Sequence, residues 1–389
     1  MSAATRPFVL LGNPENRRVG LFQQALEAQG QPPARVVSWL DFLREPARLA
    51  EAAGDEALFR IDSPGESFEV ERALLGLGHE AAVAEGCSVV TPERLAAMTE
   101  DRGLILSPRQ WMLGFQRALQ QVEAVVSQRP GWRQLNPTRT ILELFDKRRT
   151  SRRYAGAGLP VPEAVPGVTS LAELRAAMEE RGWPAVFVKL ASGSSASCLG
   201  ILERGGGREG FFTTIEQAPT GWYNNLKPRR VMHPARVEQL VGFLLREGSQ
   251  VEREVPKARL DDAFFDCRVL CIAGEPRFVV VRQNKHRITN LHLLGWRGDV
   301  EALREVVPDE AWEAAMDSCR RVAALHEGLH VGIDVLFEPG FGAHRIIEAN
   351  AFGDLLPNLT RDGLSVYEWE IRAALAAPTP APLRPTAAG

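Results

Sequence analysis

A glycine-tipped hairpin at residues 331–350, VGIDVLFEPGFGAHRIIEAN, constrains the fold more than any other stretch of the chain. Two apolar runs flank the tip PGFG, a pattern that predicts two antiparallel strands joined by a tight turn. Because side chains alternate between the faces of a strand, Asp334 points away from the apolar residues on either side of it. If the turn is centred on Phe341, Asp334 lies directly opposite Glu348, since both are seven residues away.

The second strand of this hairpin adds a further oxygen ligand. The same alternation places Ile347 and Ala349 on one face and Glu348 and Asn350 on the other. Like charges directly opposite each other destabilise a strand pair. Carboxylate and amide oxygens suit Mg²⁺, and a bound cation would make the facing pair attractive. We therefore interpret Asp334, Glu348 and Asn350 as a metal site. The alternative is a plain hairpin with a chance acidic face.

The composition is that of a water-soluble globular protein. Apolar residues make up 45% and charged residues 24% of the 389 residues, and this length favours two or three domains. No apolar run approaches the roughly 18 residues of a membrane span, and the first residues do not have the apolar core of a signal peptide. The five cysteines include no CxxC pair and are expected to be reduced. We therefore expect a cytoplasmic protein without membrane contact.

Nucleic acid is not an expected partner, because a net charge of −3 gives no general attraction to a polyanion. The basic run RRTSRR at 148–153 is interpreted as the solvated face of a helix. The sequence leaves the oligomeric state open.

Residues 1–135 predict an α/β domain built on a parallel sheet, because they begin with a β-α-β pattern. The loop after the first strand does not match GxGxxG, so a dinucleotide site is not expected. The expected elements are strands at 8–12 and 34–40 and helices at 19–30, 66–85 and 108–127.

Two further units are expected to be of α+β type. Residues 136–235 open with a helix at 136–157, with Asn136 as its N-cap and Gly158 as its terminator. Residues 236–375 hold the opening hairpin, and residues 376–389 are of low complexity and expected to be disordered. The strands expected in these units lie at 184–192 and near 249–256, 264–273 and 276–283.

Lysine is scarce in this chain, with five lysines among 46 basic residues. A lysine therefore marks a place where a compact ammonium group is needed and a planar guanidinium does not serve. The five are Lys147, Lys189, Lys227, Lys257 and Lys285.

A loop of glycine and serine follows the strand that carries Lys189. Such a loop turns backbone N–H groups and hydroxyls toward one anion, and a neighbouring lysine adds a point charge. The alternative is a flexible surface hairpin with an edge lysine. The loop does not match the Walker pattern.

Polar residues cluster on and after the two strands at 264–283. A solvated face would explain them, but together with the loop and the carboxylate pair they form the complementary parts of a polyphosphate–metal site. The cluster consists of Asp266, Arg268, Arg282, Lys285, Arg287, Asn290 and His292.

The order of these motifs over residues 136–360 resembles the ATP-grasp superfamily, which includes D-alanine–D-alanine ligase, glutathione synthetase and the ribosomal-protein glutamate ligase. The ending IIEANAFGDLLP carries the resemblance best, followed by FDCRVLCIAGE and ITNLH. The resemblance implies an N-terminal α/β domain followed by two α+β subdomains that grip ATP. The segment HPARVEQL at 233–240 has no counterpart in the family pattern.

The resemblance also implies roles for individual residues. Lys147 and Lys189 match lysines that bind ATP phosphates. The segment VEREV matches the hinge that meets adenine, although which of its glutamates makes the contact stays open. Asp334, Glu348 and Asn350 match ligands of Mg²⁺, for which Mn²⁺ is a possible substitute. The other nucleotide-binding residues are Ser192, Gly193, Ser194, Ser195, Glu252, Glu254, Val255 and Lys285, and the catalytic arginines are Arg268 with Arg282 or Arg287.

The implied activity is ATP-dependent ligation. A carboxylate substrate attacks the γ-phosphorus of ATP to give an acyl phosphate and ADP, and an amine, less often a thiol, then displaces phosphate. The substrates are expected to be an amino acid, a peptide or a related metabolite. Two alternatives use the same site: a nucleotide-binding sensor or scaffold, and a phosphoryl transferase without a second nucleophile.

Overall fold

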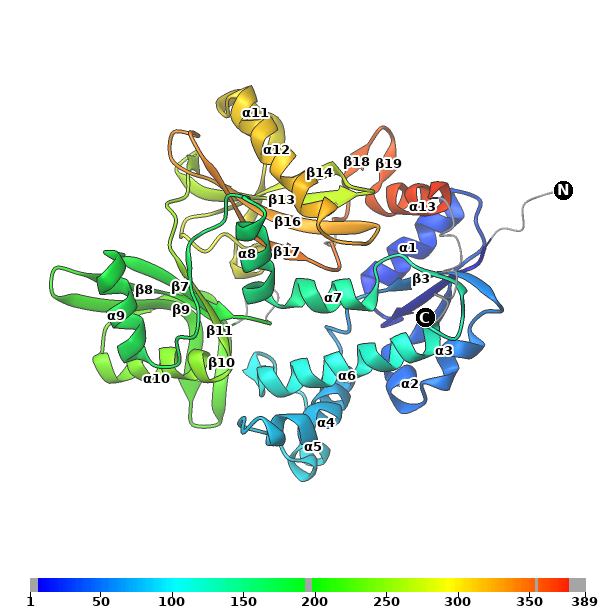
Figure 1. The fold of residues 1–389 in the computed structure, drawn as a ribbon, viewed down its shortest axis with the longest axis horizontal. Helices are drawn as coiled ribbons and strands as arrows, with labels where there is room; N and C mark the ends of the chain where they lie inside the picture. The colour runs from blue at the N-terminus through cyan, green and yellow to red at the C-terminus, as the bar shows by residue number, and fades with distance from the viewer. Residues whose placement is uncertain (1–5, 193–197, 354–355, 378–389) are drawn as a thin grey trace, which may run out of the picture.

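The computed structural model describes residues 6–192, 198–353 and 356–377, and it contains three large sheets in separate parts of the molecule (Figure 1). The parallel N-terminal sheet lies on the right of Figure 1, a seven-stranded sheet on the left and a third sheet at the top. This mixed α/β architecture confirms the predicted fold class. No helix among the described residues is both long and apolar enough to span a membrane.

The N-terminal sheet has four parallel strands in the order β2 (Arg35–Ser38), β1 (Phe8–Gly12), β3 (Glu56–Ile61) and β5 (Gly131–Gln134). The parallel pairing of β1 with β2 confirms the predicted β-α-β start. The second strand is shorter than predicted. The hydroxyl of Ser38 accepts a hydrogen bond from the N–H of Asp41, and this cap begins α2 (Trp39–Arg44) where the strand was expected to continue.

Two helices of this part pack at very short range and confirm the predictions at 66–85 and 108–127. A Cβ atom at Gly78 of α4 (Phe68–Ala84) would lie 2.1 Å from the carbonyl oxygen of Gln110 in α6 (Pro108–Val126). A Cβ atom at Gly114 would lie 1.8 Å from the carbonyl oxygen of Leu74. Glycine is therefore required at both positions. The remaining helices here are α1 (Arg17–Ala28), α3 (Ala47–Glu51) and α5 (Pro92–Ala97).

The seven-stranded sheet has the order β4 (Leu104–Ile105), β10 (Gly221–Val231), β9 (Arg208–Ala218), β8 (Leu199–Gly205), β7 (Ala185–Leu190), β11 (Ser249–Arg253) and β6 (Ala164–Val165). Helices α9 (Leu171–Arg181) and α10 (Pro234–Arg246) share a core with these strands, and HPARVEQL forms the start of α10. Strands β4 and β11 lie outside residues 136–235, so the sheet draws on all three predicted units. Their boundaries stay a proposal.

The third sheet confirms the strands expected near 264–283 and the opening hairpin. Its order is β15 (Trp296–Gly298), β14 (Glu275–Asn284), β13 (Ala263–Ile272), β16 (His330–Phe337) and β17 (His344–Asn350), with β12 (Arg259–Leu260) on β13. Cys267, Val281 and Ile333 join the largest core, which also takes in Phe115 of α6. The other elements are η1 (Leu291–Leu293), α11 (Val300–Val306), α12 (Asp309–Ala324), β18 (Thr360–Arg361), β19 (Leu364–Ser365) and α13 (Val366–Ala376).

The single helix predicted at 136–157 is wrong, because the chain breaks into α7 (Thr138–Phe145) and α8 (Lys147–Gly156). Asp146 has an extended backbone, and its carboxylate accepts hydrogen bonds from the N–H groups of Arg148 and Arg149. Asp146 is thus the N-cap of the second helix. Gly158, with φ of +69°, ends α8 as expected.

Asn136 is not an N-cap but a buried junction between distant segments. Its side-chain oxygen accepts hydrogen bonds from the N–H groups of Leu329 and His330, at 2.9 and 3.2 Å. Its amide nitrogen donates to the carbonyl groups of His330 and Ala351, at 3.0 and 2.9 Å. This side chain therefore fixes the start of β16 and the chain beyond β17 to the end of the N-terminal sheet.

Asn136→Ala should lower the free energy of unfolding by about 3 kcal/mol, because it leaves buried backbone groups without partners. Asn225→Ala is the control, since that side chain is only partly buried and bonds locally to Glu216 and the N–H of Lys227. Denaturant titration of both variants measures the difference. Equal destabilisation would show that Asn136 is not a junction.

Candidate functional site

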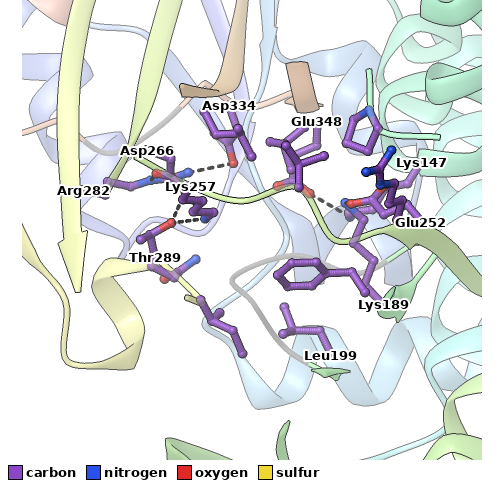
Figure 2. Close-up of a pocket in the computed structure, with 18 of the residues that line it drawn as sticks. Lys147, Lys189, Leu199, Glu252, Lys257, Asp266, Arg282, Thr289, Asp334 and Glu348 are labelled. Atoms are coloured by element: carbon purple, nitrogen blue, oxygen red, sulfur yellow. Dashed lines mark hydrogen bonds and ion pairs between the residues drawn. The ribbon is translucent and has the colours of Figure 1, made fainter. Parts of the chain in front are cut away.

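A cavity lies between the seven-stranded sheet and the third sheet (Figure 2). About 100 Å³ of it is open to the centre of a water-sized sphere. Residues from β7, β11, β13, β14, β16, β17 and the first turn of α8 line it. One part of the lining is charged and the other is apolar.

The charged part is a row of residues that crosses four neighbouring strands. Asp266 of β13 is paired in register with Arg282 of β14, and Arg268 of β13 with Asp334 of β16. Asp334 is in turn paired with Glu348 of β17. The predicted opposition of Asp334 and Glu348 is therefore confirmed. Because side chains alternate along each strand, this row and the core residues between its members take opposite faces.

Asp334 is held by two guanidinium groups. Its Oδ1 accepts a hydrogen bond from Nε of Arg268 at 2.5 Å, and its Oδ2 lies 3.0 Å from Nη2 of Arg282. Burial alone would raise the pKa of Asp334, but the two guanidiniums hold it well below its ordinary value. The charge repulsion inferred from the sequence is thus offset by the protein's own cations.

Glu348 is the more accessible of the two carboxylates. Its Oε2 lies 3.6 Å from Nζ of Lys147, and 22% of its side chain is exposed. A β-bulge interrupts the register beside it, so that Val335 pairs with Ile346 and Ile347 is the extra residue. Ile347 consequently lines the cavity together with Glu348. The prediction that Ile347 faces away from Glu348 is wrong for this reason.

The predicted metal ligands lie close together but not equally near the cavity. Asp334 and Glu348 line it, whereas Asn350 does not and instead donates a 3.4 Å hydrogen bond to Oε1 of Glu348. No group of three or more His, Cys, Asp or Glu side chains that could hold a metal occurs among the described residues. The facing pair nevertheless suits a hard cation, because Glu348 makes only long contacts and a carboxylate offers about four lone pairs.

Lys189 and Glu252 form a buried ion pair at the junction of β7 and β11, with Nζ 2.7 Å from Oε1. Burial would lower the pKa of Lys189, but the charges of Glu252 and Glu348 outweigh it and raise the pKa above the ordinary value. The lysine is therefore a fixed ammonium group that faces the cavity (Figure 2).

Lys257 is a lining residue that motif reasoning missed. Its Nζ lies 3.2 Å from Oδ2 of Asp266 and donates a hydrogen bond to Thr289. Burial lowers the pKa of Lys257 despite Asp266. The scarcity of lysine was the signal that could have found it. Lys147, Lys189 and Lys257 line the cavity, while Lys285 is exposed and does not.

Several other predicted residues lie outside the lining. Arg268 stands behind Asp334, where its Nη1 donates to the carbonyl of Gly353 at 2.9 Å. Arg287 donates hydrogen bonds to the carboxylates of Glu254, at 2.7 Å, and Glu203. Glu252 and Val255 of the predicted hinge do line the cavity. Ser192 faces neighbouring hollows, and Gly193, Ser194 and Ser195 lie outside the described residues.

Apolar side chains form the rest of the lining. Apart from Val255, which the hinge motif predicted, no sequence motif assigned these residues to the site, because they come from separate segments and meet only in the folded chain. They include Phe187, Leu199, Val255, Ile288, Leu336 and Ile347.

No known protein-family profile and no curated protein sequence matches the chain. Solved structures do match. The ATP-grasp ligase PsnB complexed with a minimal precursor is 16% identical with a TM-score of 0.54, covering 95% of this chain and 99% of PsnB. The D-cycloserine synthetase DcsG is 14% identical with a TM-score of 0.55, covering 95% and 98%. The chain has the ATP-grasp fold.

A third ATP-grasp neighbour supports the same fold assignment. The macrocyclase MdnC from Microcystis aeruginosa MRC, bound with its precursor peptide MdnA, is 9% identical with a TM-score of 0.54. The match covers 95% of this chain and all of MdnC, so the N-terminal sheet is part of the shared architecture. This agreement confirms the predicted resemblance at the level of the fold.

The two facing carboxylates of the charge row, Asp334 and Glu348, should contribute differently to stability. Asp334→Asn removes a buried anion that contacts the guanidiniums of both Arg268 and Arg282, and it should lower the free energy of unfolding by about 3–5 kcal/mol. Glu348→Gln should cost less than about 1 kcal/mol, because its pairing with Lys147 is long and partly exposed. Denaturant titration of both variants in EDTA measures their free energies of unfolding. Equal losses would show that the buried guanidiniums do not make Asp334 more important for stability than Glu348.

The difference in stability between wild type and Asp334→Asn should depend on pH in a defined way. The pKa of Asp334 is lower in the folded chain, so its stabilising effect is complete above about pH 4, the ordinary range of an aspartate. The effect is lost as the pH falls through the depressed pKa. The stability difference between wild type and Asp334→Asn should therefore be constant from neutral pH down to about pH 5 and shrink only in stronger acid.

Proposed function

We propose that this protein is an ATP- and Mg²⁺-dependent ligase that joins a carboxylate to an amine, less often a thiol, and releases ADP and phosphate. One observation carries the proposal. The ammonium groups of Lys147 and Lys189 and the facing carboxylates Asp334 and Glu348 line a single cavity, and that cavity lies in a chain with the ATP-grasp fold. Ammonium groups and a carboxylate pair are the complementary partners of phosphates and a divalent cation.

The apolar part of the cavity accommodates the adenine base. Phe187 and Leu199 come from the seven-stranded sheet, and Leu336 and Ile347 from the hairpin, so the base lies between the two sheets. The hinge residue Val255 lines the same part. The N–H group of Glu254 is already bonded to the carbonyl of Ala185 at 3.0 Å, so this N–H does not contact the nucleotide.

The charged part holds the phosphates and the metal ion. Lys189 is fixed by Glu252, and Lys147 stands at the first turn of α8 beside Glu348. Asp334 and Glu348 are the residues that would hold Mg²⁺, or Mn²⁺ in its place, and when bound the ion neutralises phosphate charge. PsnB, a structural neighbour at 15% identity and a TM-score of 0.51, was solved with Mg and ADP.

Catalysis in this proposal rests on positioning and charge. The substrate carboxylate attacks the γ-phosphorus, forming the acyl phosphate as the bond to ADP breaks; the amine then attacks the acyl carbon and phosphate leaves. Arg282 lines the cavity and is held between Asp266 and Asp334, so its charge is preorganised for the transferred phosphoryl group. Arg268 acts as a positioning residue, because it fixes Asp334.

The direct test is an ADP-release assay against pools of amino acids and small peptides. Stimulated ADP release with a product whose mass equals carboxylate plus amine minus water supports the ligase. A phosphorylated product would instead identify a phosphoryl transferase. ATP binding without stimulated turnover by any pool would identify a sensor or scaffold, and either result contradicts the proposal.

Glu348→Gln should lower Mg·ATP turnover at least about 100-fold, because metal sites lose ten- to a hundredfold even when only outer contacts are removed. The Mg²⁺ concentration for half-maximal turnover should rise as well. Glu338→Gln is the matched control, since Glu338 lies at the far end of the same hairpin and pairs with Arg345 at 2.7 Å. Normal turnover in Glu348→Gln would refute the metal assignment.

A further inference from the structure

A second hollow, the side groove, lies next to the cavity. About 440 Å³ of it is open to the centre of a water-sized sphere. The chain around β4, the ends of α7 and β7, and strand β10 form its walls. The residues that line it include Glu71, Leu104, Trp111, Phe145, Leu190 and Leu226.

The side groove adjoins the phosphate end of the cavity. Leu190 lines both hollows. Phe145 of the groove is two residues before Lys147 of the cavity, and its ring lies 5.7 Å from that of Phe352, which follows the hairpin strand β17 by two residues. The groove therefore borders the segments that carry Lys147 and Glu348.

The walls of the groove favour a flat apolar group. The rings of Trp111 and Phe145 lie 6.4 Å apart at an interplanar angle of 28°. Leu104 and Leu190 add aliphatic surface, and Leu226 is 56% exposed on the opposite strand. Aromatic walls of this kind bind rings through apolar contact and offset stacking.

One carboxylate faces this apolar surface. Glu71, on α4, is only partly exposed, and its carboxylate makes no hydrogen bond or ion pair with any of the described residues. Burial raises the pKa of Glu71, and the nearby charge of Glu100 adds to the rise. A partly desolvated carboxylate is costly unless a cation reaches it.

The neighbouring acidic residues do not share this condition. Asp101 accepts a hydrogen bond from the hydroxyl of Tyr223 at 2.6 Å, and Glu66 accepts one from the side chain of Asn16 at 2.8 Å. Glu100 lies 3.6 Å from Arg102. Among these acidic residues, Glu71 is the one whose carboxylate has no partner among the described residues. It is therefore available to pair with the cation of a bound ligand.

We propose that the side groove binds the carboxylate substrate of the ligase, and that this substrate is a zwitterion with a large apolar, preferably aromatic, side chain. Its ammonium group binds Glu71, its side chain lies against Trp111 and Phe145, and its carboxylate points toward Lys147. An aromatic amino acid or a peptide with a free amino group meets this description. The inference rests on the proposed function for its role in catalysis, but the binding site itself can be tested alone.

The test compares two probes that differ by one amine, L-phenylalanine and 3-phenylpropanoate. Their affinities are measured by calorimetry or ligand-observed NMR without nucleotide. Glu71→Gln should weaken L-phenylalanine binding about tenfold, because it removes a charge-assisted hydrogen bond in a partly buried site. It should leave 3-phenylpropanoate unchanged or slightly tighter, since a negative charge is removed near a carboxylate ligand.

Glu80→Gln is the matched control, because Glu80 lies on the same helix with 87% of its side chain exposed. It should change neither affinity by more than about twofold. Glu71→Gln should melt no lower than wild type, since the Glu71 carboxylate has no partner among the described residues. A binding change cannot then be assigned to misfolding.

The outcomes separate this inference from the proposed function. A selective loss of L-phenylalanine affinity in Glu71→Gln supports the groove even if no pool stimulates ADP release, in which case the ligase proposal fails alone. If pools stimulate ADP release but Glu71→Gln affects both probes alike or neither, the groove assignment fails alone. The absence of saturable L-phenylalanine binding to wild type also overturns it.

Discussion

The charge row on the third sheet is the interaction on which the rest of the site depends. Arg282, Asp266, Arg268, Asp334 and Glu348 come from four strands, and strand register places them on one face, with Asp266 and Arg282 beside the pairing of Arg268, Asp334 and Glu348. A slip of one residue in any strand would turn its member of the row into the apolar core. The buried members are costly unless every charge has a partner, so the row specifies the register of the sheet as well as the chemistry of the cavity.

The cavity gains its lysines from three segments that are far apart in sequence. Lys147 follows the break between α7 and α8, Lys189 is the second-last residue of strand β7, and Lys257 lies between β11 and β12. Each is held by a carboxylate, Glu348, Glu252 and Asp266 respectively. The charges that line the cavity therefore compensate one another. In the proposed function, phosphates and a divalent cation bind together because each replaces part of this compensation.

Residues that alternate or pair locally were predictable from the sequence, and those that depend on tertiary packing were not. The opposition of Asp334 and Glu348 was predicted from the spacing about Phe341, but it depends on a bulge. The pairs beside the turn, such as Val335 with Ile346, would place Asp334 opposite Ile347, and the extra residue Ile347 shifts the register so that Glu348 takes this position. The same bulge broke the alternation at Ile347. Asp146 was read as part of a helix, although a short acidic side chain before a basic run is also an N-cap. The apolar wall around Phe187 could not be found, since its members share no spacing.

The central claim is that a divalent cation links nucleotide phosphates to Asp334 and Glu348. Mn²⁺ can be added to the protein with a non-hydrolysable ATP analogue and followed by electron paramagnetic resonance and ³¹P electron–nuclear double resonance. The account predicts protein-bound Mn²⁺ with ³¹P couplings from the nucleotide and far weaker binding of Mn²⁺ without it. Bound nucleotide with all Mn²⁺ remaining as the free aqua ion would contradict the account.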